Sequence, residues 1–222
     1  YVRRNLLAGL HYNARLCHYR NLPLLFFGMM WQFCRSKMTL GTFPGFIPAG
    51  GSCPLGIIAY VNAAMELKDQ IVAGVIPEPD FIYLPLGSMG TSAGLILGLK
   101  AVGLKTQVIP VRVIEERLAS PARMLKLIRD TASLLCNFSP TFPRVTVSAH
   151  DLLIRNDCLG AGYAHFTDEG AKAADIVRTA AGIVLNGTYS AKAFSAILDD
   201  ANKRVLDGKN VLFWNTYNSR DL

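Results

Sequence analysis

Five consecutive residues, Gly87-Ser-Met-Gly-Thr91, have the composition of a turn that binds an anion. The apolar run Phe81–Leu86 precedes them and predicts a buried strand, and a helical pattern begins at Ser92. The first N–H groups of a helix lack intrahelical partners, and the helix dipole places partial positive charge at the same end. A strand, a glycine turn and a helix start therefore predict a phosphate site.

The side chains of this turn suit the same chemistry. Gly87 and Gly90 let a ligand come close to the backbone, because neither carries a side chain. Ser88 and Thr91 offer hydroxyl donors. The sequence leaves one other interpretation open, an ordinary strand-to-helix turn in which the glycines serve only packing.

Strands and helices alternate over the last three-quarters of the chain. The periodicity predicts helices at 1–40 with a break near Pro23, and at 54–70, 92–102, 120–136, 167–182 and 191–206. Apolar runs predict strands at 81–86, 106–113, 183–185 and 210–214, and residues 145–148 form either a short strand or an irregular connection. This alternation predicts an α/β fold, an open, mainly parallel, twisted sheet with helices on both faces.

Two segments before the turn give specific structural predictions. Leu22–Cys34 is the most apolar stretch, but it is shorter than the roughly 20 residues of a membrane span and contains Pro23. We therefore expect a core helix there. Ser52 or Cys53 is expected to cap the helix at 54–70, and its opening proline suits a first helical turn.

Composition excludes several classes of function. The chain has 23 basic and 16 acidic residues, a formal charge of +7, but the basic residues are scattered. No basic run with interleaved aromatics occurs, so we expect no nucleic-acid partner. Five cysteines lie apart without C-x-x-C or zinc spacing, and four histidines do not cluster, so we expect reduced thiols, a cytoplasmic location and no metal.

Five segments in register resemble D-cysteine desulfhydrases and 1-aminocyclopropane-1-carboxylate deaminases. One is the turn itself, and another, Gly160-Ala-Gly-Tyr-Ala164, resembles the Gly-x-Gly-Tyr-Gly loop of that family. A third, Leu185–Ala193, resembles its Asp-Pro-x-Tyr-[Ser/Thr/Glu]-Gly-Lys-Ala segment. The remaining two are Ile47–Val61 and the terminal Val211–Thr216.

The resemblance implies a tryptophan synthase β-like fold (fold type II) that binds pyridoxal 5'-phosphate between two α/β domains. It assigns residues 1–45 to the end of the small domain and residues 46–222 to the large cofactor-binding domain. It also implies a homodimer that acts on a small amino acid. We expect no membrane partner, because Leu22–Cys34 is too short to span a membrane.

The resemblance further implies roles for single residues. Tyr189 lies near the cofactor ring and acts as a base or nucleophile, and Tyr163 orients the substrate, although both also suit structural roles. A hydroxyl of Ser190 or Thr216 faces the pyridine nitrogen, unless Ser190 is only a helix cap. The phosphate is held by the backbone amides and side chains of the turn, Gly87, Ser88, Met89, Gly90 and Thr91.

The chain also departs from this family. The family lysine that carries the cofactor lies in an upstream Ser-Gly-Asn-Lys segment, which this sequence lacks, and Lys192 matches a structural lysine instead. Ala164 and Ala191 stand where the family has glycine, and Asn186-Gly187 replaces Asp-Pro. Because the chain opens at Tyr1 without methionine, we expect further sequence upstream.

The sequence favours a pyridoxal-phosphate lyase or deaminase, and two other functions remain open. Glu115 and Glu116 lie where an acid binds ribose in NAD(P)-dependent oxidoreductases, although the turn is not G-x-G-x-x-G. A protein that keeps the fold but lacks the cofactor lysine would instead be catalytically silent.

Overall fold

The computed structural model describes residues 2–217, with side chains from Leu6 onward. The chain divides into two compact units, of which one ends at Phe46 and the other begins at Ile47. The assignment of the two units to the small and large domains of a larger protein stays a prediction.

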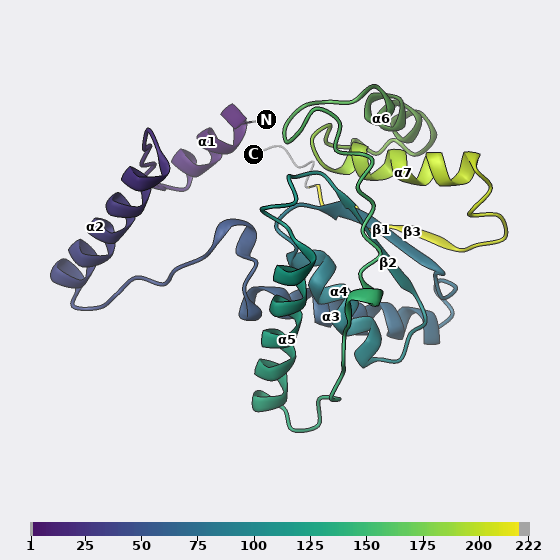
Figure 1. Ribbon diagram of the computed structural model, residues 1–222, viewed down its shortest axis with the longest axis horizontal. Coiled ribbons are helices and arrows are strands. Elements are labelled where there is room, and N and C mark those ends of the chain that lie inside the picture. The colour runs from purple at the N-terminus through teal and green to yellow at the C-terminus, as the bar shows by residue number, and fades with distance from the viewer. Residues whose placement is uncertain (1, 218–222) are drawn as a thin grey trace. The chain divides into compact units, whose positions relative to one another are not determined.

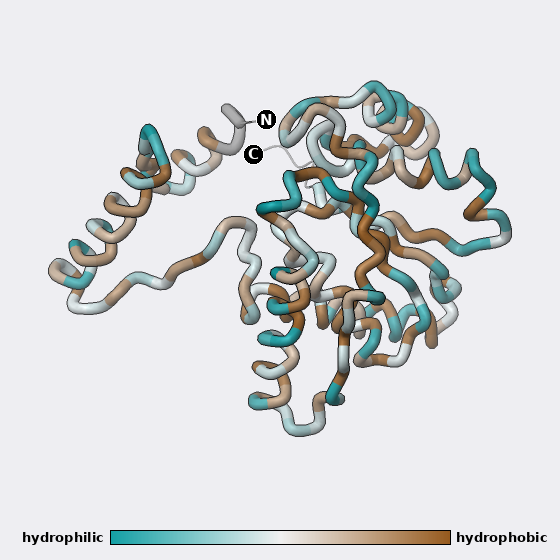
Figure 2. Tube along the Cα trace, viewed as in Figure 1, coloured by the Kyte–Doolittle hydropathy of each residue, from teal (hydrophilic) through white to brown (hydrophobic). Residues whose placement is uncertain are grey.

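The first unit contains the helices α1 (Val2–His11) and α2 (Leu22–Leu40), and the predicted break lies between them (Figure 1). Asn21 caps α2, because its side chain accepts a hydrogen bond from the Leu24 N–H at 3.0 Å. The predicted core helix is wrong: no residue of α2 is buried, although apolar residues follow one another along it (Figure 2). Two helices alone cannot enclose a helix that is apolar around its circumference. None of the described helices is both long and apolar enough to cross a membrane.

The second unit is built on a three-stranded parallel sheet. Its strands are β1 (Phe81–Leu86), β2 (Gln107–Arg112) and β3 (Val211–Phe213), in the order β2-β1-β3. Because all pairs are parallel, the carboxyl ends of the three strands meet at one edge of the sheet. The strands predicted at 81–86, 106–113 and 210–214 are therefore confirmed.

Helices cover both faces of this sheet (Figure 1). One face carries α3 (Pro54–Val72), α4 (Gly90–Ala101) and α5 (Pro121–Phe138). The other carries α7 (Ser190–Asn202), against which α6 (Asp168–Ala181) packs. This arrangement confirms the predicted α/β fold.

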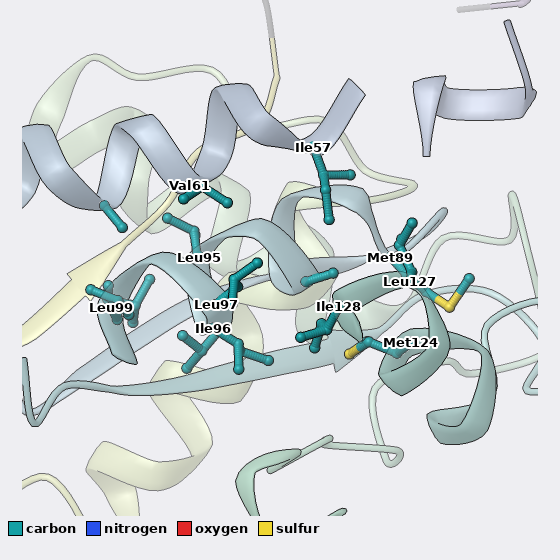
Figure 3. Close-up of a cluster of buried hydrophobic side chains, with 14 of the residues drawn as sticks. Ile57, Val61, Met89, Leu95, Ile96, Leu97, Leu99, Met124, Leu127 and Ile128 are labelled. Carbon is teal, nitrogen blue, oxygen red and sulfur yellow. The ribbon is translucent and has the colours of Figure 1, made fainter. Parts of the chain in front are cut away.

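The main core lies between the sheet and the layer of α3, α4 and α5 (Figure 3). Every residue from Ser92 to Leu99 of α4 is buried, so this helix is enclosed on all sides. Gly94 and Gly98 make this possible, because α3 approaches them closely. A Cβ added at Gly98 would lie 2.6 Å from Ala64 Cβ and 2.8 Å from Val61 O.

Several elements of the structure differ from the prediction. Residues 183–185 form no strand, because Gly182 ends α6 in a left-handed conformation and Ile183 and Val184 are exposed in the link to α7. Residues 145–148 are an irregular connection, followed by the short 3₁₀ helix η2 (Ala149–Asp151). The last long helix ends at Asn202 and not near residue 206, and a second 3₁₀ helix, η1 (Ala49–Gly51), precedes α3.

Candidate active site at the carboxyl edge of the sheet

The glycine turn (Gly87–Thr91) lies directly beyond the last residue of β1. Met89 is the N-cap of α4 and has a left-handed backbone, with φ of 73°. Its side chain is buried in the main core (Figure 3), which fixes the turn from beneath. Ser88 is exposed and Thr91 is half-buried, so the side of the turn that faces away from the core is accessible.

Ser52 supports the turn from the segment that precedes α3. Its hydroxyl donates a hydrogen bond to Ser88 Oγ at 2.8 Å. A Cβ at Gly90 would lie only 2.7 Å from Ser52 Oγ, so this contact requires glycine at position 90. Of the two expected caps of α3, Cys53 occupies the N-cap position, without a side-chain hydrogen bond, and the Ser52 hydroxyl is bound to Ser88 instead.

The chemistry of the turn fits a phosphate group. The first N–H groups of α4 have no intrahelical acceptors and carry the positive end of the helix dipole. The hydroxyls of Ser88 and Thr91 lie in the same turn. Ser92 Oγ, in the first turn of the helix, is buried and has no hydrogen-bond partner among the described residues. Such a concentration of donors suits an acceptor-rich anion.

The two predicted catalytic tyrosines lie together beside this turn. The Tyr163 and Tyr189 hydroxyls form a hydrogen bond, and the ring centroids are 5.8 Å apart with an interplanar angle of 64°. A Cβ built on Gly87 would lie 3.7 Å from Tyr189 Cε1, which places the Tyr189 ring against the first residue of the turn. Residues from three separate segments are thus brought to one place.

Asn186 organises the backbone before α7 and so positions Tyr189, the N-cap of that helix. Its Oδ1 accepts hydrogen bonds from the Thr188 N–H at 2.9 Å and the Tyr189 N–H at 3.1 Å. Asparagine thus makes the bonds that an aspartate would make in the resembled motif. Ser190 is buried, and its Oγ accepts the Asn186 N–H at 2.7 Å.

Thr216 follows β3 at the same edge of the sheet. Phe213 of β3 pairs with Tyr83 of β1, and Thr216 and Leu86 each lie three residues further along their chain segments. Thr216 is exposed. The Thr216 side chain is therefore accessible in the segment that follows β3, whereas the hydroxyl of Ser190 is enclosed within its own turn.

The Tyr163 loop (residues 159–164) is held by polar groups. Lys192 is fully buried, at 0% exposure, and its Nζ donates to Leu159 O at 2.6 Å and to Gly162 O at 3.1 Å. Burial lowers the pKa of the Lys192 ammonium. Glu115 accepts the Tyr163 N–H at 3.5 Å, and its own N–H and that of Tyr163 lower the pKa of its carboxyl.

An ionic cluster anchors the chain that leads into this loop. Arg155 Nη1 donates to both carboxylate oxygens of Asp200 at 2.6 Å, and its other nitrogens bind Asp157 and Asp199. Tyr83 of β1 donates its hydroxyl to Asp200 Oδ2 at 2.5 Å. The Arg155 guanidinium lowers the pKa of Asp157, and burial, followed by the bond to Asp200, raises the pKa of Tyr83.

The backbone of the Tyr163 loop is unusual at three positions. Gly160, Gly162 and Ala164 have φ of 64°, 132° and 62°. Only glycine adopts such angles without strain, so Ala164 keeps a conformation that suits the glycine of the resembled motif. Although alanine replaces glycine at position 164, the backbone there keeps the left-handed conformation that glycine favours.

Three supporting residues were not assigned to the site from the sequence. The sequence predicts only a helix cap at Ser52, only a possible ribose ligand at Glu115, and only a structural lysine at Lys192. One signal pointed to Lys192: it is a lone cation among small residues in the first turn of a helix, where the dipole disfavours positive charge. The described residues contain no group of three or more His, Cys, Asp or Glu side chains that could hold a metal.

Comparison with known sequences identifies the class of protein. The family described as pyridoxal-phosphate dependent enzyme matches residues 35–216, which include the glycine turn and both tyrosines. The chain belongs to this family. Pyridoxal 5'-phosphate is its cofactor, and the predicted family and cofactor are confirmed.

One solved structure with a similar fold agrees with this assignment. An ACC deaminase homologue matches with a TM-score of 0.77 and 27% identity, over 96% of this chain and 61% of that chain. A threonine deaminase from T.th. matches with a TM-score of 0.45 and 20% identity, over 77% of this chain and 61% of that chain. The serine racemase of Dictyostelium discoideum matches with a TM-score of 0.43 and 20% identity, over 75% of this chain and 51% of that chain. The chain thus spans less than two thirds of the length of each of these three proteins.

Proposed function

We propose that the complete protein is a pyridoxal-phosphate lyase or deaminase that acts on a small amino acid. The observation that carries this proposal is the pair of hydroxyls, Tyr163 and Tyr189, beside a turn that fits a phosphate. The likeness to the ACC deaminase homologue, which extends over nearly all of this chain, supports it. When bound, the cofactor supplies an electron sink for charge that develops on the substrate.

The glycine turn would hold the phosphate of the cofactor. The backbone amides at the start of α4 and the hydroxyls of Ser88 and Thr91 would donate to the phosphate oxygens. Ser52 would keep the Ser88 side chain in place through their hydrogen bond. None of these interactions requires the tyrosines, so cofactor binding and turnover should respond to different substitutions.

Tyr189 would move a proton at the substrate, and Tyr163 would orient it. As a phenolate, Tyr189 would accept the hydrogen bond that the Tyr163 hydroxyl donates and would take up the substrate proton, while Tyr163 stays protonated. Because Asn186 fixes the backbone of Tyr189, the hydroxyl would be presented in a defined direction.

The hydroxyl near the pyridine nitrogen would favour β-elimination over ring opening. Thr216 is our assignment, because Ser190 Oγ is already bound to the backbone of Asn186. A neutral hydroxyl leaves the nitrogen largely unprotonated, which weakens the electron sink and suits a substrate with a good leaving group. Loss of a proton from Cα and of thiol from Cβ, as with D-cysteine, meets that condition better than opening of a cyclopropane ring.

Substitution of Tyr189 by phenylalanine in the complete protein tests this function. Turnover of D-cysteine should fall by at least about 100-fold, the low end of the range for loss of a general base. Cofactor affinity should change less than twofold. Tyr12→Phe is the matched control, because Tyr12 is exposed and lies in the first unit. Unchanged turnover in Tyr189→Phe would remove Tyr189 from the mechanism.

Borohydride reduction separates an active enzyme from a silent one. The complete protein mixed with pyridoxal phosphate should develop a visible absorption band that borohydride bleaches, and peptide mapping should find the label on a lysine. A protein that binds the cofactor without any labelled lysine would be catalytically silent. A shift of melting temperature with NAD alone would favour the oxidoreductase.

A homodimer and a cytoplasmic location complete the proposal. The homodimer follows from the resemblance, and sedimentation of the complete protein measures it. The cytoplasmic location rests on the five dispersed cysteines, which are all free in the structure. Both statements stay predictions.

A further inference from the structure

We infer that Lys192 is a positioning residue that sets the orientation of Tyr163 by binding the backbone carbonyls of the loop before it. This inference rests on the proposed function, because it assigns Tyr163 a part in the reaction. It gives the buried Lys192 ammonium a task distinct from that of the lysine that carries the cofactor.

The placement of Lys192 is costly by itself. Its side chain is fully buried in the first turn of α7, where the helix dipole disfavours a cation. Its two hydrogen-bond acceptors are backbone carbonyls, Leu159 O at 2.6 Å and Gly162 O at 3.1 Å. An apolar residue at this position would avoid these costs. What the ammonium adds is two hydrogen bonds that hold the backbone of the loop in one conformation.

The two carbonyls are placed so that they control Tyr163. Leu159 and Gly162 bracket the turn of the loop, and Gly162 directly precedes Tyr163. Tyr163 then bonds to Tyr189, which lies three residues before Lys192 at the start of the same helix. The contacts therefore form a closed ring through α7, the ammonium, the loop and the two hydroxyls.

Within this ring, Lys192 and Tyr189 share one rigid helix end, while Tyr163 belongs to a loop with three residues at positive φ. The loop has few apolar contacts of its own, because Gly160, Ala161, Tyr163 and Ala164 are all exposed. The ammonium thus links α7 to the backbone of the loop, in addition to the direct bond between the Tyr163 and Tyr189 hydroxyls.

Hydrogen exchange on the 222-residue chain without cofactor tests the link directly. Lys192→Met keeps the length of the side chain but removes its donors, and exchange of amides in residues 157–166 should rise at least tenfold. Amides in residues 81–99, across β1 and α4, should keep their rates. Lys172→Met, an exposed lysine of α6, is the matched control and should change neither segment.

Kinetics of the complete protein provide the second measurement. Lys192→Met should lower kcat for D-cysteine at least tenfold and leave cofactor affinity within twofold. Lys192→Gln, which keeps amide donors, should recover part of the exchange protection and of kcat. If Lys192→Met does not fold, the comparison of Lys192→Gln with the unmodified protein serves in its place.

Three outcomes would overturn the inference: unchanged exchange in residues 157–166, a uniform rise over the whole chain, or a borohydride label on Lys192. The first two would leave Lys192 without a specific effect on the loop, and the third would make it the lysine of the cofactor. Raised exchange at the loop in a protein that turns over no amino acid would instead contradict the proposed function alone, because the exchange measurement needs no cofactor.

Discussion

The glycine turn is held by apolar side chains beneath it, whereas the Tyr163 loop is held by hydrogen bonds and charges. Met89 anchors the turn in the core between α3, α4 and α5. Lys192, Glu115 and the Arg155 cluster anchor the loop and the chain that leads into it. We expect the turn to withstand changes of pH and salt that alter the loop, because apolar packing carries no charge.

The largest expected effect is a difference between the rates at which Cys158 and the exposed cysteines react with iodoacetamide. Burial raises the pKa of the Cys158 thiol from 9.0 to about 11, so at pH 8 it holds about 100-fold less reactive thiolate than an ordinary cysteine. Cys17 and Cys34 are exposed and should react first. Peptide mapping over time measures the three rates. Equal rates would mean that the chain before the Tyr163 loop opens freely.

Gly98→Ala tests the apolar support of the turn. The new Cβ would meet Ala64 Cβ at 2.6 Å and Val61 O at 2.8 Å, so α3 and α4 must move apart. Overpacking costs up to about 3 kcal/mol, and the better helix preference of alanine offsets about 1. The free energy of unfolding should fall by about 2 kcal/mol.

Urea unfolding measures this loss. Gly45→Ala is the control, because a Cβ at Gly45 meets nothing within 4 Å. Equal stability of Gly98→Ala and the unmodified chain would show that the two helices are not in close contact, and the apolar support of the turn would be refuted.

Asp157→Asn tests the ionic support of the loop and has the smallest expected effect. The Arg155 guanidinium holds the folded pKa of Asp157 below 3.8, so its stabilisation is present above that pH and is lost as pH falls through the folded pKa. The variant should be less stable at pH 7 by under about 1 kcal/mol, since the carboxylate is half exposed. The difference in stability should disappear as the pH falls through the folded pKa of Asp157.

Urea midpoints at pH 7, 5 and 3 measure this gap. Asp207→Asn, an exposed residue outside the cluster, is the control. A gap that persisted at low pH would assign the effect to packing and not to charge.

The comparison also explains how much could be predicted from the sequence. The turn was predictable, because the apolar run before it and the helical period after it are local signals that the core enforces. Apolar composition predicts a strand at the exposed Ile183-Val184, because composition alone cannot show which apolar runs reach a sheet. The Tyr163 loop was found only through resemblance, and its support by Lys192 and Glu115 depends on contacts across 30 to 48 residues that no local pattern encodes.

The pairing of β1 with β3 has a consequence for how the molecule is made. Asp80, just before β1, accepts the N–H of Asn210, just before β3, across 130 residues of chain. During synthesis β1 and the glycine turn leave the ribosome long before that partner strand exists. One side of β1 therefore stays unpaired and open to other extended chains, so the nascent protein is vulnerable to aggregation until β3 has been synthesised.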